Sequence, residues 1–160
     1  MKEEQASLLR ELVTGRRVAA LGTLHDGAPY VSMTPFAMLR DGAGFVIHVS
    51  GLAAHTRDMM LDQRVSLLIA GEEQPNGSVQ ALPRVTILAT ARQIAVDSPE
   101  YPLAREAYLA RFPEAAPMFT LGDFSLFLIT PTEVRWVAGF AQARTLSPLA
   151  FARAIQGTQE

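Results

Sequence analysis

The chain has 160 residues with 14 Lys or Arg, 16 Asp or Glu and no cysteine, and 49% of them are hydrophobic. This length favours one domain, expected over residues 1–160, and the formal net charge of -2 argues against a nucleic-acid partner. The lack of cysteine excludes disulfides and thiolate metal sites. The start Met1–Gln5 is unlike a secretory signal, and no apolar run approaches about 20 residues, so we expect a cytoplasmic protein without membrane spans.

Hydrophobic periodicity predicts a mixed chain in which short strands outnumber helices. The expected elements, in chain order, are a helix over 3–15, strands over 18–24, 30–36 and 45–50, a helix over 52–60, strands over 64–70 and about 82–96, a helix over about 98–111, short strands over 124–129 and 134–138, and a short helix over 147–155 in the C-terminal tail 147–160.

Local signals mark several of the expected boundaries. Gly15 is suited to end the first helix, and His25-Asp26-Gly27 is typical of a hairpin turn. Ser50 is the candidate N-cap of the helix over 52–60. The apolar run 64–70 predicts a central strand buried on both faces, and Thr130-Pro131-Thr132 is expected to separate the last two strands.

The hairpins indicate an antiparallel sheet, and no regular βαβ alternation occurs. A barrel or closed sheet of about six or seven strands with peripheral helices is therefore expected, a mainly β (α+β) fold, because closure removes exposed strand edges.

The histidines give little evidence for a metal site or a catalytic triad. His25 lies in a predicted turn and is expected to face solvent. His48 and His55 are seven residues apart, without the spacing or third ligand of a metal site, so no metal is expected. No phosphate-binding glycine loop, zinc-protease motif or nucleophile elbow occurs, and no local signature points to a Ser–His–Asp triad.

The segment from His48 to Arg57 passes from a strand through small residues into a helix. A helix N-terminus attracts anions through its free N–H groups. Polar groups of the types that hold a phosphate are added by Ser50, His55, Thr56 and Arg57. The alternative is a capped helix whose polar residues face water.

Several segments resemble one family of proteins. They are Ser32-Met33-Thr34-Pro35-Phe36-Ala37, Leu52-Ala53-Ala54-His55-Thr56-Arg57, Leu82-Pro83-Arg84-Val85-Thr86, Gly122-Asp123-Phe124 and Val137-Ala138-Gly139-Phe140-Ala141-Gln142-Ala143. In order and spacing they are similar to the FMN-binding split barrels related to pyridoxamine 5'-phosphate oxidase, and most similar to the haem-utilisation (HugZ-like) branch. The resemblance covers residues 15–146. It implies an antiparallel split β-barrel and a homodimer with the cofactor in a cleft at its interface.

The resemblance also implies which residues contact the cofactor. They are Met33, Thr34, Pro35, Phe36, His48, Val49, Ser50, His55, Thr56, Arg57, Arg84 and Trp136. The chain departs from the oxidase where that enzyme keeps cations, because Met33 replaces a basic residue and Ala54 and His55 replace an Arg–Lys pair.

Five of these contacts have a structural alternative. Pro35 lacks an N–H and could mark a strand edge. His55 and Arg57 could be exposed helix residues, Arg84 an edge-strand charge, and Trp136 a core or interface anchor.

The first functional hypothesis is an FMN-binding homodimer that acts as an oxidoreductase on an unknown small substrate, without assigned catalytic residues. Oxidation of pyridoxamine phosphate is not expected, because the substrate-binding Arg–His pair of the oxidase is missing. A haem-binding or haem-degrading protein is the second hypothesis, with His48 or His55 replacing the ligand that the branch has in a C-terminal extension. A cofactor-free structural or carrier dimer is the third, because Met33 and Ala54 have lost the charges of the oxidase.

Overall fold

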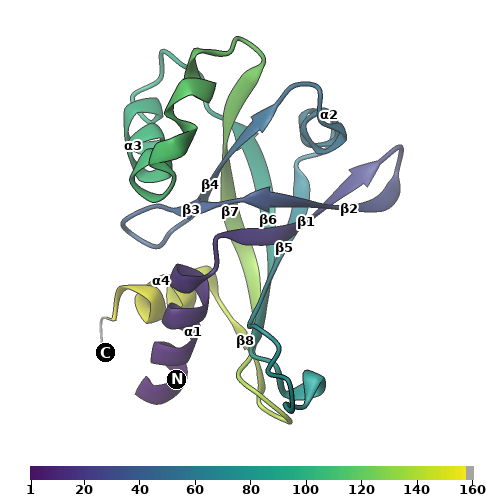
Figure 1. Cartoon of the computed structure of the whole chain (residues 1–160), viewed down its shortest axis with the longest axis vertical. Coiled ribbons are helices and arrows are strands. Elements are labelled where there is room, and N and C mark those ends of the chain that lie inside the picture. The colour runs from purple at the N-terminus through teal and green to yellow at the C-terminus, as the bar shows by residue number, and fades with distance from the viewer. Residues whose placement is uncertain (158–160) are drawn as a thin grey trace.

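The computed structural model describes residues 1–157. It contains one eight-stranded antiparallel sheet surrounded by helices (Figure 1). The strands are β1 Val18–His25, β2 Ala28–Pro35, β3 Ala37–Met38, β4 Phe45–Ser50, β5 Arg64–Ala70, β6 Arg84–Gln93, β7 Phe124–Val137 and β8 Ala143–Leu146. The helices are α1 Glu3–Gly15, α2 Ala54–Leu61, α3 Tyr101–Arg111 and α4 Pro148–Gln156, with short 3-10 helices η1 Val79–Ala81 and η2 Pro113–Thr120.

The strand order closes the sheet upon itself. The order is β2-β1-β5-β6-β7-β4-β3, and β8 adds to β7. Since β2 and β3 are successive parts of residues 28–38, one run of chain forms both edges of the sheet. Between them the N–H of Phe36 donates to the carbonyl of Arg17 at 3.2 Å. The mainly β split barrel expected from the sequence is therefore confirmed.

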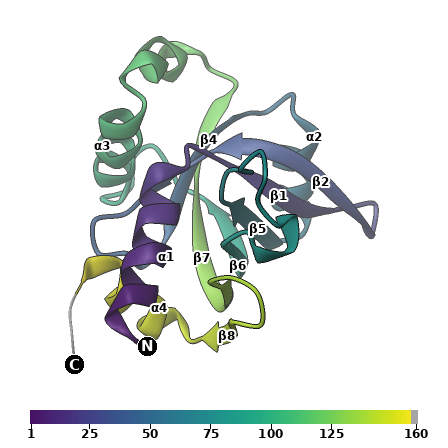
Figure 2. The same cartoon turned by 60° about the horizontal axis from the view of Figure 1, so that its bottom comes forward.

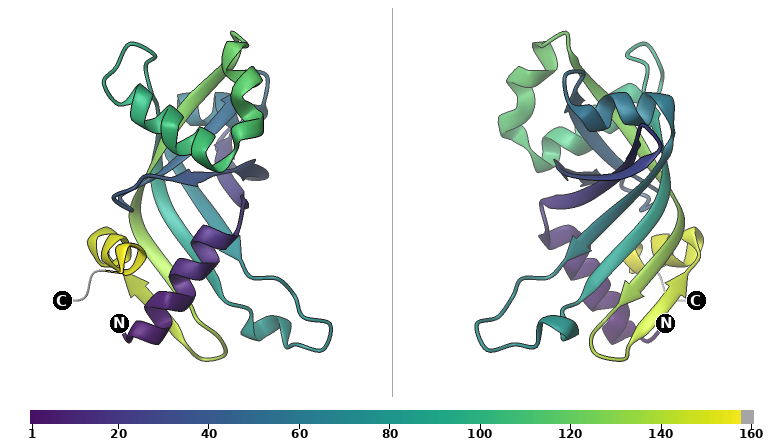
Figure 3. Two further views of the ribbon diagram at one scale, coloured as in Figure 1. Left: turned by 60° about the vertical axis from the view of Figure 1, so that its left-hand side comes forward. Right: turned by 90° about the vertical axis from the view of Figure 1, so that its right-hand side faces the viewer.

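The helices cover different parts of this barrel. Helix α3 and η2 lie over β4, α2 lies beside β1, and α1 packs against α4 at the opposite end (Figures 2 and 3). The barrel interior is the main apolar core, and a second buried cluster lies between β4 and α3. In the described residues, no helix is long and apolar enough to cross a bilayer.

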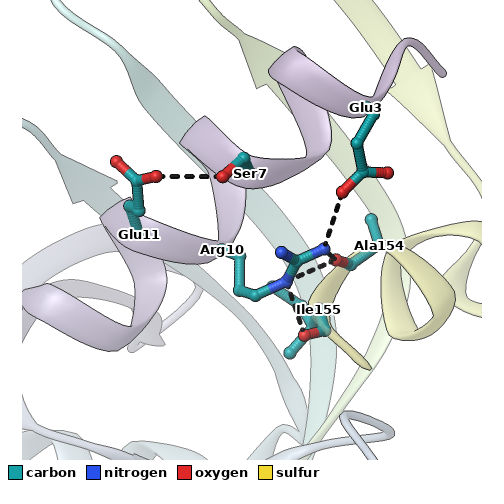
Figure 4. A network of polar contacts seen from close by, with 6 residues as sticks. All are labelled: Glu3, Ser7, Arg10, Glu11, Ala154 and Ile155. Atoms are coloured by element: carbon teal, nitrogen blue, oxygen red, sulfur yellow. Dashed lines mark hydrogen bonds and ion pairs between the residues drawn. The ribbon is translucent and has the colours of Figure 1, made fainter. Parts of the chain in front are cut away.

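The N-terminal and C-terminal helices are joined by one arginine (Figure 4). Arg10 donates from Nε and Nη2 to the carbonyl of Ala154 at 3.1 and 2.9 Å, and from Nε to that of Ile155 at 3.0 Å. These carbonyls lie in the last turn of α4, where no intrahelical donor is left for them. Gly157 follows with φ 72°, a conformation suited to glycine after a helix.

The last long strand differs from the sequence prediction. Two strands separated by a turn at 130–132 were expected, but β7 runs without interruption through this segment. The register with β6 shifts between Leu88 and Ala89, so that Thr132 has no partner across the ladder. Such a bulge accommodates an extra residue while the strand continues. Pro131 stays buried opposite Ala89.

Two smaller expectations are also wrong. Strand β5 alternates between buried and exposed residues and is not buried on both faces, and Leu68 is 40% exposed. The N-cap of α2 is Ala53 and not Ser50. The turn at 25–27 is confirmed, with positive φ angles of 50° at Asp26 and 78° at Gly27. Strand β8 was not expected.

Candidate functional site

Helix α2 lies against β1 of the β1–β2 hairpin (Figure 3). Polar side chains join the helix to both strands. Ser32 on β2 pairs with Leu21 on β1 and so shares the barrel-facing side of the sheet. Its Oγ lies 2.9 Å from Nδ1 of His55 in the first turn of α2. Burial lowers the pKa of His55, and the charge of Asp58 opposes this shift only in part. The imidazole of His55 is therefore neutral at pH 7.

One turn further along α2, Asp58 is the centre of a second polar cluster. Its carboxylate accepts from Thr23 Oγ1 at 2.8 Å, and its other oxygen lies 2.7 Å from His25 Nδ1. Although only 3% of Asp58 is exposed, its pKa is lowered. Burial alone would raise it, but hydrogen bonds from His25 and Thr23, with the positive charges nearby, outweigh that effect.

These contacts correct the expectation for His25. A free, solvent-facing turn residue was predicted, but its half-exposed ring is bound to Asp58. Sequence reasoning missed Asp58, although one signal was present. It follows His55 by three residues, a spacing that places the two side chains on the same face of a helix.

At the start of α2, the polar groups of the β4–α2 junction hold one another. The Ser50 hydroxyl donates to Asp123 Oδ2 at 2.7 Å, and Thr56 Oγ1 donates to the Ser50 carbonyl at 2.7 Å. No side chain caps the helix. In its first turn the N–H of Thr56 donates to the Ala53 carbonyl at 3.2 Å, so the N–H groups before it are the ones open to an anion. Arg57 is exposed, and no ion pair holds it within residues 1–157.

His48 lies on the opposite side of β4 from the barrel interior. Its ring stacks on Phe119 at 3.8 Å between centroids and has Phe124 at 5.1 Å and Tyr108 at 5.6 Å. Burial lowers the pKa of His48 to about 4. Its neighbour Val49 points into the barrel core. The structure thus separates His48 from His55, which the sequence placed in one site.

The other predicted contacts are scattered. On β2, Met33 is 61% exposed on the outer face, whereas Thr34 is buried, as is Phe36 just after the strand. Pro35 ends the strand, in line with its strand-edge alternative. Arg84 donates to the carbonyls of Gln80 and Leu82.

Trp136 lies apart from the polar cluster. It is fully buried within the main core, as its core-anchor alternative requires. Of the predicted contacts, Ser50, His55, Thr56 and Arg57 come together at the start of α2. Met33 on β2 is the sequence neighbour of Ser32, which contacts His55. A contact of any of the predicted residues with a cofactor stays a prediction.

The outer face of the sheet carries an apolar row. Cross-strand pairing places Met33 beside Ala20 and Ala20 beside Leu68. The next row contains Val31 on β2 and, three strands further on, Leu88 on β6, with Gly22 and Ser66 between them. Val31 is 70%, Leu68 40% and Leu88 46% exposed. Contiguous exposed apolar side chains of this kind mark interaction surfaces.

The donor set at α2 fits an anionic group better than a bare metal ion. Among the described residues, no three His, Cys, Asp or Glu side chains come together as metal ligands. The open helix N-terminus with Arg57 suits a phosphate or a carboxylate. The exposed imidazole of His25 offers one nitrogen, and a metal already bound in a porphyrin needs no more than one or two such ligands.

Fold and site together define a class: a split barrel whose first hairpin packs beside helix α2. The family model for pyridoxamine 5'-phosphate oxidase matches residues 6–138, and the chain belongs to this family.

Curated relatives of the chain are named for haem. It is 34% identical over 138 residues to the chloroplastic heme oxygenase HOZ of Arabidopsis thaliana, covering 84% of this chain but 40% of that protein. It is 28% identical over 141 residues to the heme oxygenase HutZ of Vibrio cholerae, covering 87% of this chain and 79% of the relative.

A solved structure agrees with these relatives. The heme binding protein of Mycobacterium smegmatis matches with a TM-score of 0.81 and 28% identity, over 92% of this chain and 60% of that one. The chain thus spans less than two thirds of two of these three relatives.

Proposed function

We propose that the protein binds haem on a dimeric split barrel and takes part in haem degradation. The relatives named above support this proposal, since all three are named for haem. Of the hypotheses drawn from the sequence, they favour the haem alternative over the FMN oxidoreductase. We keep the cytoplasmic location as a prediction, although one relative is chloroplastic.

The observation that carries the proposal is the charge at the start of α2. A flavin phosphate is a dianion and is held in the oxidase by an Arg–Lys pair, whose positions here are Ala54 and His55. The Ser32 contact and the lowered pKa leave His55 neutral. Arg57 is then the single cation of α2. One guanidinium and a few N–H groups match a haem propionate, which carries one charge, better than a phosphate.

In this arrangement Arg57 and the first turn of α2 bind the propionate and orient the ligand. Bound haem would supply the oxygen-activating chemistry of a haem oxygenase. We assign no proton-transfer residue.

The exposed apolar row of β2, β1, β5 and β6 is proposed as the dimer interface. Its four large side chains leave a surface that a second copy of the same sheet would cover, and a two-fold axis needs one self-complementary patch. Small residues between them, Ala20 and Gly22, keep this face flat. The cofactor cleft is proposed to lie at the edge of this interface, next to Met33.

Titration with hemin and with FMN, followed by gel filtration, tests the proposal. We expect a Soret band that stays with the protein and no retained flavin. Replacing His55 and Arg57 together by Ala should weaken haem binding about tenfold or more, the size of one charge-assisted hydrogen bond. Arg40→Ala, far along the chain in an exposed ion pair with Glu106, is the matched control and should leave affinity unchanged.

FMN binding is the second candidate, since the uncapped start of α2 also suits a phosphate. Retained flavin absorbance without a retained Soret band would establish this candidate and refute the haem proposal. A protein that retains neither, and gains no thermal stability from either, would support the cofactor-free dimer instead.

A further inference from the structure

One short segment covers the buried imidazole of His48. Helix η2 lies between α3 and the start of β7, and its Phe119 ring stacks on the imidazole at 3.8 Å between centroids, with 6° between the planes. Tyr108 of α3 and Phe124 of β7 lie at 5.6 and 5.1 Å. His48 is only 7% exposed as a result, and Phe119 is the part of its cover that η2 supplies.

Helix η2 itself is weakly held to the rest of the chain. Ala115 is its one buried residue and Phe119 is half-buried, whereas its other residues are exposed. Among the described residues, no backbone hydrogen bond joins 113–120 to the sheet. Glu114 forms an ion pair with Arg17, but this pair is exposed and contributes little. Segments with so few buried contacts open at a lower cost in free energy than the core does.

The chain is fixed on both sides of η2. Before it, Phe112 is buried, and its N–H donates to the Tyr108 carbonyl of α3 at 2.9 Å. After it, the carbonyl of Asp123 accepts from the N–H of Gly51 at 2.6 Å, and its carboxylate accepts from Ser50. Helix η2 can therefore move away from β4 while α3 and β7 stay in place, and this movement would take Phe119 off the imidazole.

The rings and cations around His48 favour an uncharged imidazole. Phe119 and Phe124 are apolar, and burial raises the pKa of the Tyr108 hydroxyl to about 12, so this group carries no charge. The guanidinium of Arg105 on α3 lies 5.2 Å from the centroid of Phe119. The ring that stacks on His48 therefore already carries one cation, and a second cation on the same ring would be repelled by the first.

The acidic groups of the surrounding elements are held by other partners. They are Glu106 with Arg40, Glu114 with Arg17, and Asp123 with Ser50. Within residues 1–157, none of them forms an ion pair with His48. A proton on His48 would leave an imidazolium in apolar surroundings without a counter-charge, and for this reason burial lowers its pKa to about 4.

We propose that η2 is a flap that opens when His48 takes up a proton, and that it then uncovers an apolar surface made by Tyr108, Phe119 and Phe124. In the closed form the neutral imidazole stacks on Phe119. In the open form water reaches the ring and solvates the imidazolium. This inference is independent of the proposed haem binding.

The sign and size of the effect follow from proton linkage. The pKa of His48 is 6.5 when the ring is solvated and about 4 under the flap, so the open form binds the proton first and acid favours opening. Between about pH 7.5 and pH 5.5, these two values predict that the ratio of open to closed form rises about tenfold.

The chain has no cysteine, so one introduced thiol can report the opening. Ala115→Cys places a thiol on the buried side of η2, where dithiodipyridine can react with it only in the open form. Ala116→Cys, at the exposed position beside it, corrects for the effect of pH on the reaction itself. We expect the ratio of the two rates to rise about tenfold over this pH range. The ratio should stay constant when His48→Phe is added, because phenylalanine keeps the stacked ring without a titrating group.

A further thiol separates local opening from unfolding of the whole domain. Ala19→Cys lies on β1 in the main core and is 2% exposed, so we expect it to stay unreactive over the same pH range. Hydrogen exchange of the unmodified protein gives the same readout without a thiol, because the protection of residues 113–120 should fall about tenfold. Circular dichroism at both pH values checks that each variant is folded.

Three results would overturn the flap. They are a constant rate ratio in the protein that keeps His48, an equal rise with His48→Phe, and a thiol at Ala19→Cys that reacts with the same pH dependence as the thiol at Ala115→Cys.

Discussion

Ser32 Oγ and His55 Nδ1 lie 2.9 Å apart, and this contact joins the edge strand β2 to the first turn of α2. It occupies the imidazole at the position where the oxidase relatives keep a free cation. The proposed preference for a carboxylate over a phosphate depends on this position.

Restoring the cations should change the cofactor preference. In the double variant Ala54→Arg, His55→Lys, we expect FMN to bind at least tenfold more tightly, because each charge-assisted hydrogen bond to a phosphate contributes about 1.5–3 kcal/mol. Quenching of flavin fluorescence measures the affinity. Placing the same two cations at the exposed, uncharged positions Gln74 and Ser78 is the control, and an equal gain in affinity in both variants would show a non-specific charge effect.

The dimer proposal predicts that one charge on the outer face separates the protomers. Leu68→Asp places a carboxylate between Ala20 and Thr86 in the centre of the apolar row. Its burial in an interface would leave an unpaired charge, so we expect a monomer by light scattering. Leu103→Asp changes a 64% exposed leucine on α3 and should leave the mass unchanged. A Leu68→Asp protein with the mass of the unmodified one would place the interface elsewhere.

Arg10 should contribute measurably to stability. Arg10→Met keeps the aliphatic stem but removes the donors to the last carbonyls of α4. We expect the free energy of unfolding to fall by about 1–2 kcal/mol, as for other half-buried hydrogen bonds to charged groups.

Urea denaturation measures this loss, with Arg92→Met as its control. Arg92 forms a half-exposed ion pair with Glu100 at 2.8 Å, and its loss should cost less than about 0.5 kcal/mol. A similar loss in both variants would mean that the hydrogen bonds from Arg10 to α4 stabilise the fold no more than the Arg92–Glu100 ion pair does.

His48 should make the protein sensitive to mild acid. Its pKa falls from 6.5 in the unfolded chain to about 4 in the folded protein, so the unfolded state binds the proton first. The stabilisation that neutral His48 contributes is present in full above pH 6.5 and is lost as the pH falls toward 4. Over this window we expect a loss of about 2–3 kcal/mol, at about 1.4 kcal/mol per pKa unit.

His48→Phe should flatten this part of the stability curve, because phenylalanine keeps a ring against Phe119 without a titrating group. Unfolding by urea between pH 4.5 and 7 measures the effect. This range stays above the lowered pKa of Asp58, whose contribution is lost only at lower pH. Equal slopes in the two proteins would assign the acid sensitivity to another group.

The local pattern of the sequence was sufficient for most of the elements. Helix α1, strand β4 and the Asp26-Gly27 turn have the bounds that periodicity and turn chemistry predict, because these signals depend on neighbours within a few residues. Strand β7 was divided at Pro131 because a proline normally interrupts a ladder. The bulge that accommodates it depends on the partner strand β6 and has no local signal.

The candidate site was predicted in part for the same reason. The polar residues at the start of α2 are consecutive in sequence, so Ser50, His55, Thr56 and Arg57 could be grouped before the fold was known. His48 was grouped with them by proximity along the chain. In a strand, however, successive side chains point to opposite faces, and the packing of α3 and η2 decides that His48 is enclosed.

The sequence by itself therefore determined the family, the strand-rich barrel and the loss of the two cations at Ala54 and His55, because each is written in residue identity and spacing. Only the tertiary structure decided that Asp58 orients His25, that Ser32 holds His55, and that Trp136 is in the core. These pairs join segments more than 20 residues apart, and their contacts come into being only when the sheet closes and α2 packs on its first hairpin.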